Sequence, residues 1–332
     1  MCDLEAFART AAGEIDPLRI RQGIVLPWHG AAYGAGMSYA PHADPHRGEL
    51  HQHQHQRQHH QQGSDDHARM LDLEAEVLAG HLAAITEWLP VASSPRGVVD
   101  LGSGTGAGTF ALLDLFPHTY VTAVDSSAVH LQRLREKARA RGVEGQVSTA
   151  QADLDSRDWP DLGTPDLVWA SASMHHLADP DRVLRTVHDT LAPGGLFAVV
   201  GLAGFPRFLP DDAPENRPGL EERCHAASDR HFAEHVPNRG IDWAPKLTAA
   251  GFSLEAERTF TVRVENSANK AVRTYAMGSL RRLRDSSAEG VPAEDLAVLD
   301  RLLDTASPDS ILRREDLAVR TERVVWAARR TT

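Results

Sequence analysis

A glycine-rich loop is the first feature of this sequence that could do chemistry. An apolar run leads to Asp100, and the loop that follows contains one serine among closely spaced glycines: Gly102, Ser103, Gly104 and Gly106. Glycines allow positive φ angles in such a turn and let a ligand touch bare backbone. The loop therefore predicts a binding site for a nucleotide-like ligand, with a carboxylate beside it.

Two more acidic positions follow later apolar runs. Asp125, with Ser126 after it, lies 21 residues beyond Gly104, and a carboxylate at that spacing binds ribose hydroxyls. Asp153 can accept a hydrogen bond from an adenine amino group, and Leu154 beside it offers an apolar surface to the ring. These positions suit a ligand that contains adenosine.

The loop alone leaves two ligands open. Gly102, Gly104 and Ala107 satisfy the G-x-G-x-x-G/A pattern of dinucleotide-binding proteins. However, Asp100 lies where a dinucleotide would place its pyrophosphate near a helix N-terminus. The carboxylate would repel that anion, whereas it suits a cationic amine and a sulfonium.

Alternating strands and helices must position these residues. Helical spacing of leucines predicts a helix over residues 69–89 that stops at Pro90, and a second helix is predicted over Ser126–Arg141. Five short apolar runs predict strands: Gly97–Leu101, Tyr120–Asp125, Gln146–Ala150, Asp166–Ala170 and Leu196–Val200. This alternation is typical of a doubly wound parallel α/β sheet, which binds ligands at the carboxyl ends of its strands. Two extended patterns, 252–264 and 321–327, follow near the end of the chain.

Five segments in succession carry a family resemblance. They are VVDLGSGTGAGTFAL (98–112), TAVDSS (122–127), AQADLDS (150–156), PDLVWASASMHHLADP (165–180) and LAPGGLFAVV (191–200). In order and spacing they resemble the motifs of class I S-adenosylmethionine-dependent methyltransferases, and RTERVVWAARR (320–330) resembles the closing antiparallel strand of that family. The resemblance implies a Rossmann-like, seven-stranded sheet with a reversed C-terminal hairpin.

The resemblance also implies roles for the residues of the predicted site. Asp100 and the glycine loop, including Ser103, would hold the methionine part of S-adenosyl-L-methionine. Asp125 and Ser126 would meet the ribose, and Asp153 and Leu154 the adenine. Ala170 and Ser171 would pass beside the sulfonium. As an alternative, glycines of this loop serve only helix–strand packing, which is as plausible for Gly108 as ligand binding.

Three histidines are candidate catalytic residues. Methyl transfer is an in-line displacement, so the protein mainly aligns the reactants and excludes water, while a general base can help deprotonate a phenol, hydroxyl or ammonium acceptor. His175 and His176 follow the fourth predicted strand, and His225 lies in a later segment. The alternatives are cofactor-wall packing or helix capping for the pair and a surface position for His225. Arg207 could pair with an acidic acceptor, or only with Asp211 or Asp212.

Composition divides the chain into two parts. Residues 1–66 form an N-terminal extension that contains the run HQHQHQRQHHQQGSDD, which we expect to be flexible because it has few aliphatic side chains to bury. Residues 67–332 form the methyltransferase domain, with a cofactor-binding core over 96–202. Segments 203–240 and 265–319 are longer than a compact sheet requires, and they predict helical lids over the acceptor. Metal chelation by the histidine run is the alternative use of the extension.

Charge and hydropathy narrow the function further. The chain has 332 residues, and its 35 Lys and Arg against 46 Asp and Glu give a net charge of −11, which disfavours nucleic acid as a partner. No segment approaches the roughly 18 apolar residues of a membrane span. We therefore expect a cytoplasmic enzyme that methylates an oxygen, nitrogen or carbon of a small-molecule acceptor, without a metal at its site. Two other functions stay open, an NAD(P)-dependent oxidoreductase and a His-rich metal-binding or scaffold protein.

Overall fold

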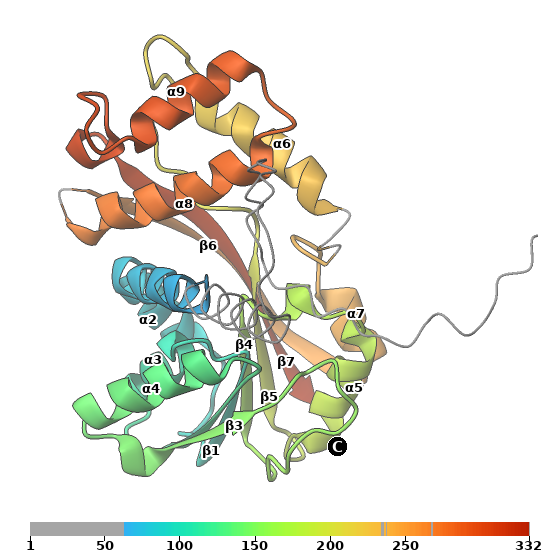
Figure 1. The fold of residues 1–332 in the computed structure, drawn as a ribbon. Helices are drawn as coiled ribbons and strands as arrows, with labels where there is room; N and C mark the ends of the chain where they lie inside the picture. Colours follow the sequence, from blue (N-terminus) through green and yellow to red (C-terminus); the bar gives the residue numbers. More distant parts are fainter. Residues whose placement is uncertain (1–62, 234–235, 237, 267, 332) are drawn as a thin grey trace, which may run out of the picture. The chain divides into compact units, whose positions relative to one another are not determined.

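A seven-stranded mixed sheet organises the chain (Figure 1). The computed structural model describes residues 63–233, 236, 238–266 and 268–331. Its strands are β1 (Gly97–Leu101), β2 (Tyr120–Asp125), β3 (Val147–Gln151), β4 (Leu167–Ser171), β5 (Leu196–Leu202), β6 (Phe252–Glu265) and β7 (Ala318–Arg330). Five parallel strands are followed by an antiparallel pair in the order β3-β2-β1-β4-β5-β7-β6. This confirms the doubly wound sheet with a reversed C-terminal hairpin.

Helices cover both faces of the sheet. Helices α2 (Ala79–Trp88), α3 (Ala107–Leu115) and α4 (Ala128–Ala140) pack on one face, and α5 (Pro180–Thr190) and α7 (Ala244–Ala249) pack on the other. Successive strand residues alternate between the two cores: Val98 faces the first group of helices and Val99 the second. Because both faces are covered, the strands read as continuous apolar runs.

A helical layer stands over the far part of the β6–β7 hairpin. It consists of α6 (Leu220–Ala233), α8 (Ala271–Ser287) and α9 (Ala293–Leu303) (Figure 1). Its own hydrophobic cluster includes Leu220, Tyr275 and Leu299 together with Val262 of β6 and Val319 of β7. The three helices fall within the two segments that the sequence predicts as lids.

The N-terminal helical segment differs from its prediction. Residues 63–77 are helical, a turn interrupts the helix at Leu78, and α2 continues to Trp88. The two parts of this segment pack against different hydrophobic clusters. Val77 and Leu78 belong to the cluster of the helical layer, whereas Ile85 packs on the sheet. The helix over residues 63–77 is called the N-terminal helix below.

The predicted N-terminal extension falls almost entirely outside the described residues. That includes the histidine-rich run, so its flexibility and its metal chelation stay predictions. Residues 63–66, which were assigned to the extension, belong to the N-terminal helix. The division of the chain at residue 66 also stays a prediction. No helix among the described residues is long and apolar enough to cross a lipid bilayer.

Two strands begin one residue later than predicted. Gln146 ends a short 3-10 helix (Glu144–Gln146), and its amide donates to the carbonyl oxygens of Pro117 and Thr119 at 2.8 and 3.0 Å. The Asp166 carboxylate accepts from the backbone N–H groups of Arg96 and Gly97 at 2.7 and 3.2 Å. Both side chains thus bind backbone at the start of a strand, an interaction that hydrophobicity patterns do not reveal.

Candidate cofactor and acceptor site

The glycine loop lies between the ends of β1, β2 and β4. The N–H groups of Gly102 and Ser103 donate to the carbonyl oxygen of Val124 at 2.8 and 2.9 Å. Gly102 has a φ of 70°, and a Cβ added there would lie 2.3 Å from the Cβ of Ser173. No other residue type fits this position, because a side chain would both strain the backbone and collide. Gly106, with a φ of 97°, is the N-cap of α3.

Gly108 meets a different neighbour. A Cβ at this position would lie 2.4 Å from the indole nitrogen of Trp169 and 3.2 Å from a carboxylate oxygen of Asp100. The glycine therefore lets α3 approach β4, which is the packing role that the sequence left open for it.

Asp100 is a buried carboxylate without a cationic partner. Its side chain is almost inaccessible, and Oδ2 accepts from the Thr109 hydroxyl at 2.7 Å. Burial raises the pKa of Asp100 to about 7. Among the described residues, no Lys, Arg or His forms an ion pair with it. In the same loop, the buried Ser103 hydroxyl has no hydrogen-bond partner.

These two side chains test whether the site fits the implied cofactor. A buried carboxylate favours a cation beside it, and a buried hydroxyl without a partner favours a polar ligand group. The methionine part of S-adenosylmethionine carries an ammonium and a carboxylate, so the loop and Asp100 fit it. A pyrophosphate would meet the Asp100 carboxylate with like charge.

Asp125 at the end of β2 is held by three donors. Its Oδ2 accepts from the Gly104 N–H at 2.8 Å, and its Oδ1 accepts from the Ser127 N–H at 2.8 Å and faces His130 Nδ1 at 3.2 Å. Burial pushes the pKa of Asp125 upward, but the hydrogen bonds from His130, Ser127 and Gly104 outweigh it and the pKa is lowered. Asp125 is therefore an ionised acceptor, as a ribose ligand requires.

The other predicted cofactor residues lie at neighbouring strand ends. Ser126 is exposed, and the N-cap of α4 is Ser127, whose side chain accepts from the His130 N–H at 3.3 Å. Asp153 is also exposed, and its Oδ1 accepts from the Asp155 N–H at 2.9 Å. Leu154 is half-buried and packs against the hydrophobic core.

The end of β4 carries a strained backbone. Ala170 is fully buried and Ser171 half-buried, and the next residue, Ala172, has a φ of 52°. Left-handed backbone is unfavourable for a residue with a Cβ and often marks a functional turn. The Ala172 N–H donates to the carbonyl oxygen of Val200 at 2.9 Å, which ties this turn to β5.

His175 and His176 follow in a short 3-10 helix (Met174–His176). Their ring centroids are 4.0 Å apart. Burial lowers the pKa of His175 to about 3, with further contributions from the positive charges of His176, Arg239 and Arg323. Desolvation also lowers the pKa of His176, although part of its side chain remains exposed.

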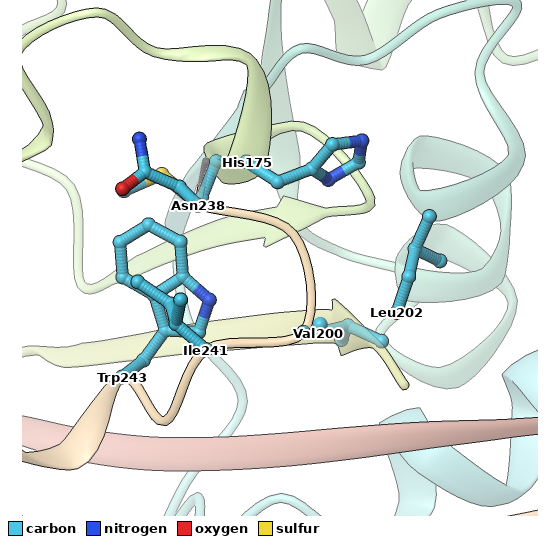
Figure 2. A pocket seen from close by; sticks show the side chains of 9 residues that line it. His175, Val200, Leu202, Asn238, Ile241 and Trp243 are labelled. Atoms are coloured by element: carbon cyan, nitrogen blue, oxygen red, sulfur yellow. The ribbon is translucent and has the colours of Figure 1, made fainter. Parts of the chain in front are cut away.

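A small cavity adjoins His175 at the ends of β4 and β5. Figure 2 shows His175 together with Val200, Leu202, Asn238, Ile241 and Trp243, and Met174, Gly201 and Gly240 complete the lining. Asn238 fixes the loop on one side of the cavity because its amide donates to the Leu177 carbonyl at 2.9 Å. The cavity joins the end of β4 to the loop that precedes α7.

The third histidine candidate lies elsewhere. His225 is buried in α6, where its ring stacks on Phe205 with centroids 6.2 Å apart. Its Nε2 has no hydrogen-bond partner and lies 3.7 Å from a Glu221 carboxylate oxygen. His225 does not line the cavity of Figure 2. A surface position, the alternative to a catalytic role for His225, is wrong, since hydrophobic periodicity did not show that this face of α6 is buried.

Two arginines outside the helices of the helical layer, Arg207 and Arg320, form ion pairs that the sequence did not identify. Arg207 pairs with Glu222 at 2.6 Å, and not with Asp211 or Asp212. Asp211 instead lies 3.4 Å from Arg320.

The N-terminal helix packs against the glycine loop and α4. Asp72 accepts from the Thr105 hydroxyl at 2.7 Å and pairs with Arg133 and Lys137 of α4. Glu74 pairs with the buried Arg323 of β7 at 2.7 Å. The sequence showed only the spacing of Arg133 and Lys137 on one helical face; their partner lies more than 60 residues away.

His67 of the same helix lies beside His130 and close to Asp125. Its ring centroid is 5.2 Å from that of His130, which faces Asp125. Burial lowers the pKa of His67 to about 4, with contributions from Arg282, His130 and His176. The helix therefore brings a neutral imidazole to the strand ends.

Three comparisons relate the chain to known proteins. A family model for a methyltransferase domain matches residues 99–197. A trans-aconitate 2-methyltransferase of Paracidovorax citrulli (strain AAC00-1) is 37% identical over 225 residues, which are 65% of this chain and 80% of that protein. Another, of Acidovorax sp. (strain JS42), is 35% identical over 106 residues, 32% of this chain and 38% of that relative. The YcgJ protein of Bacillus subtilis aligns with 76% of this chain and 99% of its own, at 16% identity and a TM-score of 0.49.

Proposed function

The chain belongs to the class I S-adenosylmethionine-dependent methyltransferases, and we propose that it transfers a methyl group to an anionic small molecule. One observation carries the cofactor half of this proposal: the buried Asp100 carboxylate beside the glycine turn has no cationic partner among the described residues. A ligand with an ammonium group supplies that partner.

The chain's own residues bind and orient the reactants. Asp100, Ser103 and the backbone of Gly102, Gly104 and Gly106 hold the methionine part. Asp125 accepts from the ribose hydroxyls, with Ser126 beside it. When bound, S-adenosylmethionine supplies an activated methyl group at its sulfonium.

The adenine and the sulfonium would lie at two further strand ends. Asp153 and Leu154 would border the adenine, and Ala170 and Ser171 would border the sulfonium. Alignment and exclusion of water are the main contributions of the protein to such a displacement. The N-terminal helix serves both purposes because it covers the loop and is tied to it through Asp72.

Positive charge around His175 supports an acidic acceptor. Arg323 pairs with Leu202 in the sheet and Arg239 lies between Asn238 and Gly240, so both belong to segments that border the cavity with His175. After burial and the charge of His176, both arginines also contribute to the lowered pKa of His175. The relatives are named as methyltransferases of trans-aconitate, which is a carboxylate. Guanidinium groups recognise carboxylates through charge-assisted hydrogen bonds.

The low pKa of His175 bears on the need for a general base. A ring with a pKa of about 3 is a weak base at neutral pH. A carboxylate acceptor is already ionised and does not require deprotonation. We therefore infer that His175 orients the acceptor; general-base roles for His176 and His225 stay predictions.

Isothermal titration calorimetry tests the cofactor half. Folded protein freed of cofactor should bind S-adenosylmethionine with 1:1 stoichiometry, and NADH should give no heat. Binding of NADH without binding of S-adenosylmethionine would restore the oxidoreductase interpretation. Nothing in the comparisons favours that interpretation, and metal binding by the histidine-rich run concerns residues outside those described.

A further inference from the structure

Arg239 is fixed in place by aromatic rings and one carboxylate. Its guanidinium carbon lies 4.0 Å from the ring centroid of Phe205 and 5.3 Å from that of Phe232. Nη2 donates to the Asp229 carboxylate on α6. Cation–π contacts together with this ion pair hold the flat guanidinium in one orientation.

One donor of this fixed group has no partner. Nη1 of Arg239 is buried without a hydrogen-bond acceptor, and only 13% of the side chain is exposed. Buried donors of charged groups are normally paired, since an unpaired one loses its hydration without compensation. Nη1 therefore lacks an acceptor among the described residues, and an acceptor oxygen from a ligand would supply the missing hydrogen bond.

Arg239 lies in the loop that forms one side of the cavity with His175, although its own side chain is not part of the lining. Asn238 and Gly240, on either side of it in the sequence, both line that cavity, and Figure 2 shows Asn238 there. The charge of Arg239 acts on His175, which directly follows the β4 turn.

Two other arginines near this region have no buried side-chain donor without a partner. Arg323 donates to Glu74 at 2.7 Å and to the Thr321 hydroxyl at 3.0 Å. Arg207 pairs with Glu222 at 2.6 Å. Arg239 alone among these three leaves a buried guanidinium donor unpaired.

We propose that Arg239 determines acceptor specificity by binding a carboxylate of the acceptor through Nη1. This inference rests on the proposed methylation of an anionic small molecule and assigns the residue that recognises it. The contacts of the guanidinium with the Phe205 and Phe232 rings restrict its orientation, so recognition depends on geometry as well as on charge.

The experiment compares Arg239→Met and Arg239→Lys with the wild type and with Arg207→Met. Arg207 is a matched control because, like Arg239, it pairs with a carboxylate of α6, whereas none of its side-chain nitrogens is buried without a partner. The acceptor probes are trans-aconitate and other small di- and tricarboxylates, with their methyl esters as uncharged counterparts. We expect Arg239→Met to raise KM for the acids about 10- to 100-fold, the usual effect of losing a hydrogen bond to a charged group. Arg239→Lys should fall between, since it keeps the charge without the planar fork, and Arg207→Met should resemble the wild type.

Two controls separate this inference from the function on which it rests. The S-adenosylmethionine Kd and the melting temperature of each variant should stay near wild type, which excludes misfolding. If the wild type methylates an acid and Arg239→Met keeps its KM, the assignment of Arg239 is wrong while the proposed function stands. If the wild type binds S-adenosylmethionine but methylates only the esters, the anionic acceptor and Arg239 both fail. If it does not bind S-adenosylmethionine, the proposed function itself fails.

Discussion

Two carboxylates in the cofactor site have opposite electrostatic environments. Asp100 is buried with only the Thr109 hydroxyl as a side-chain donor, and its pKa rises to about 7. Asp125 receives hydrogen bonds from His130 and two backbone N–H groups, and its pKa is lowered in spite of burial. A bound cation would therefore stabilise the ionised form of Asp100, whereas Asp125 is already ionised and held in position by its hydrogen bonds.

Replacing Asp100 should stabilise the fold and weaken the binding of the cofactor. Because its pKa is raised above the unfolded value of 3.8, burial of this group costs more stability as pH rises from about 4 to 7. Asp100→Asn should therefore melt several degrees above the wild type at pH 8, and the gap should shrink toward pH 5. Differential scanning calorimetry at both pH values measures it. An Asn variant that melts lower at pH 8 would show that Asp100 is stabilised by a cation in the free protein.

Asp125→Ala should weaken binding of S-adenosylmethionine by about 1–3 kcal/mol, because hydrogen bonds to a charged group are lost. Isothermal titration measures this effect, with the exposed Asp114→Ala as a control on the distal side of α3. Unchanged affinity would show that Asp125 is not the ribose ligand. Circular dichroism must accompany the titration, since Asp125 also holds the Gly104 and Ser127 backbone.

The N-terminal helix is the element on which closure of the site depends. A single carboxylate, Asp72, joins it to the glycine loop through Thr105 and to α4 through Arg133 and Lys137. The pKa of Asp72 is lowered overall. Burial alone would raise this pKa, but the hydrogen bonds from Lys137 and Thr105 and the charge of Lys137 outweigh the effect of burial. The helix is thus attached by ionic contacts at one side and by Glu74 at the other.

Asp72→Asn should loosen this helix. The substitution leaves Arg133 and Lys137 without their shared anion, and we expect a loss of about 1–3 kcal/mol in stability together with weaker S-adenosylmethionine binding. Hydrogen exchange over residues 63–77 reports the loosening directly. Asp66→Asn is a matched control, because its pair with Arg69 in the same helix is largely exposed. Equal exchange in both variants would mean that Asp72 does not hold the helix.

The whole molecule combines a parallel sheet that binds the cofactor with a helical layer raised on a long antiparallel hairpin. Strands β6 and β7 pair from Phe252–Arg330 at one end to Glu265–Ala318 at the other, far beyond the end of β5 (Figure 1). Histidines with a lowered pKa lie in the N-terminal helix, in α2 and after β4. Their protonation therefore affects the stability of the whole fold.

Stability should fall steeply below pH 6.5. Burial lowers the pKa of His67 and His81 to about 4 and that of His175 to about 3. The unfolded chain therefore binds more protons than the folded one between pH 6.5 and 4, and stability decreases as pH falls through that window. The raised pKa of Asp100 has the opposite effect on stability over this pH range, but it is a single group against these three histidines. Melting temperatures measured from pH 8 to 5 should decline below pH 6.5, and a flat or rising curve would contradict these pKa directions.

From the sequence alone, glycine spacing and apolar periodicity predicted the parallel sheet and placed Asp100, Asp125 and Asp153 at strand ends, because these are local signals. The cofactor followed from the resemblance of five segments to the class I methyltransferases. Strand ends were predicted to within a residue or two for β1 to β5. For the two long insertions, the sequence predicted helices but not how they pack, since their packing partners lie on the distant hairpin.

Only the tertiary structure decided what surrounds those residues. Asp72 and Thr105 are 33 positions apart, Glu74 and Arg323 are 249 apart, and no periodicity couples them. The free donor of Arg239 likewise follows from burial between Phe205 and Phe232, which their sequence positions do not reveal. Pairing and burial depend on which surfaces meet when the chain folds. For this reason the cofactor residues could be predicted from local sequence signals, whereas the residues on the acceptor side could be identified only from the tertiary structure.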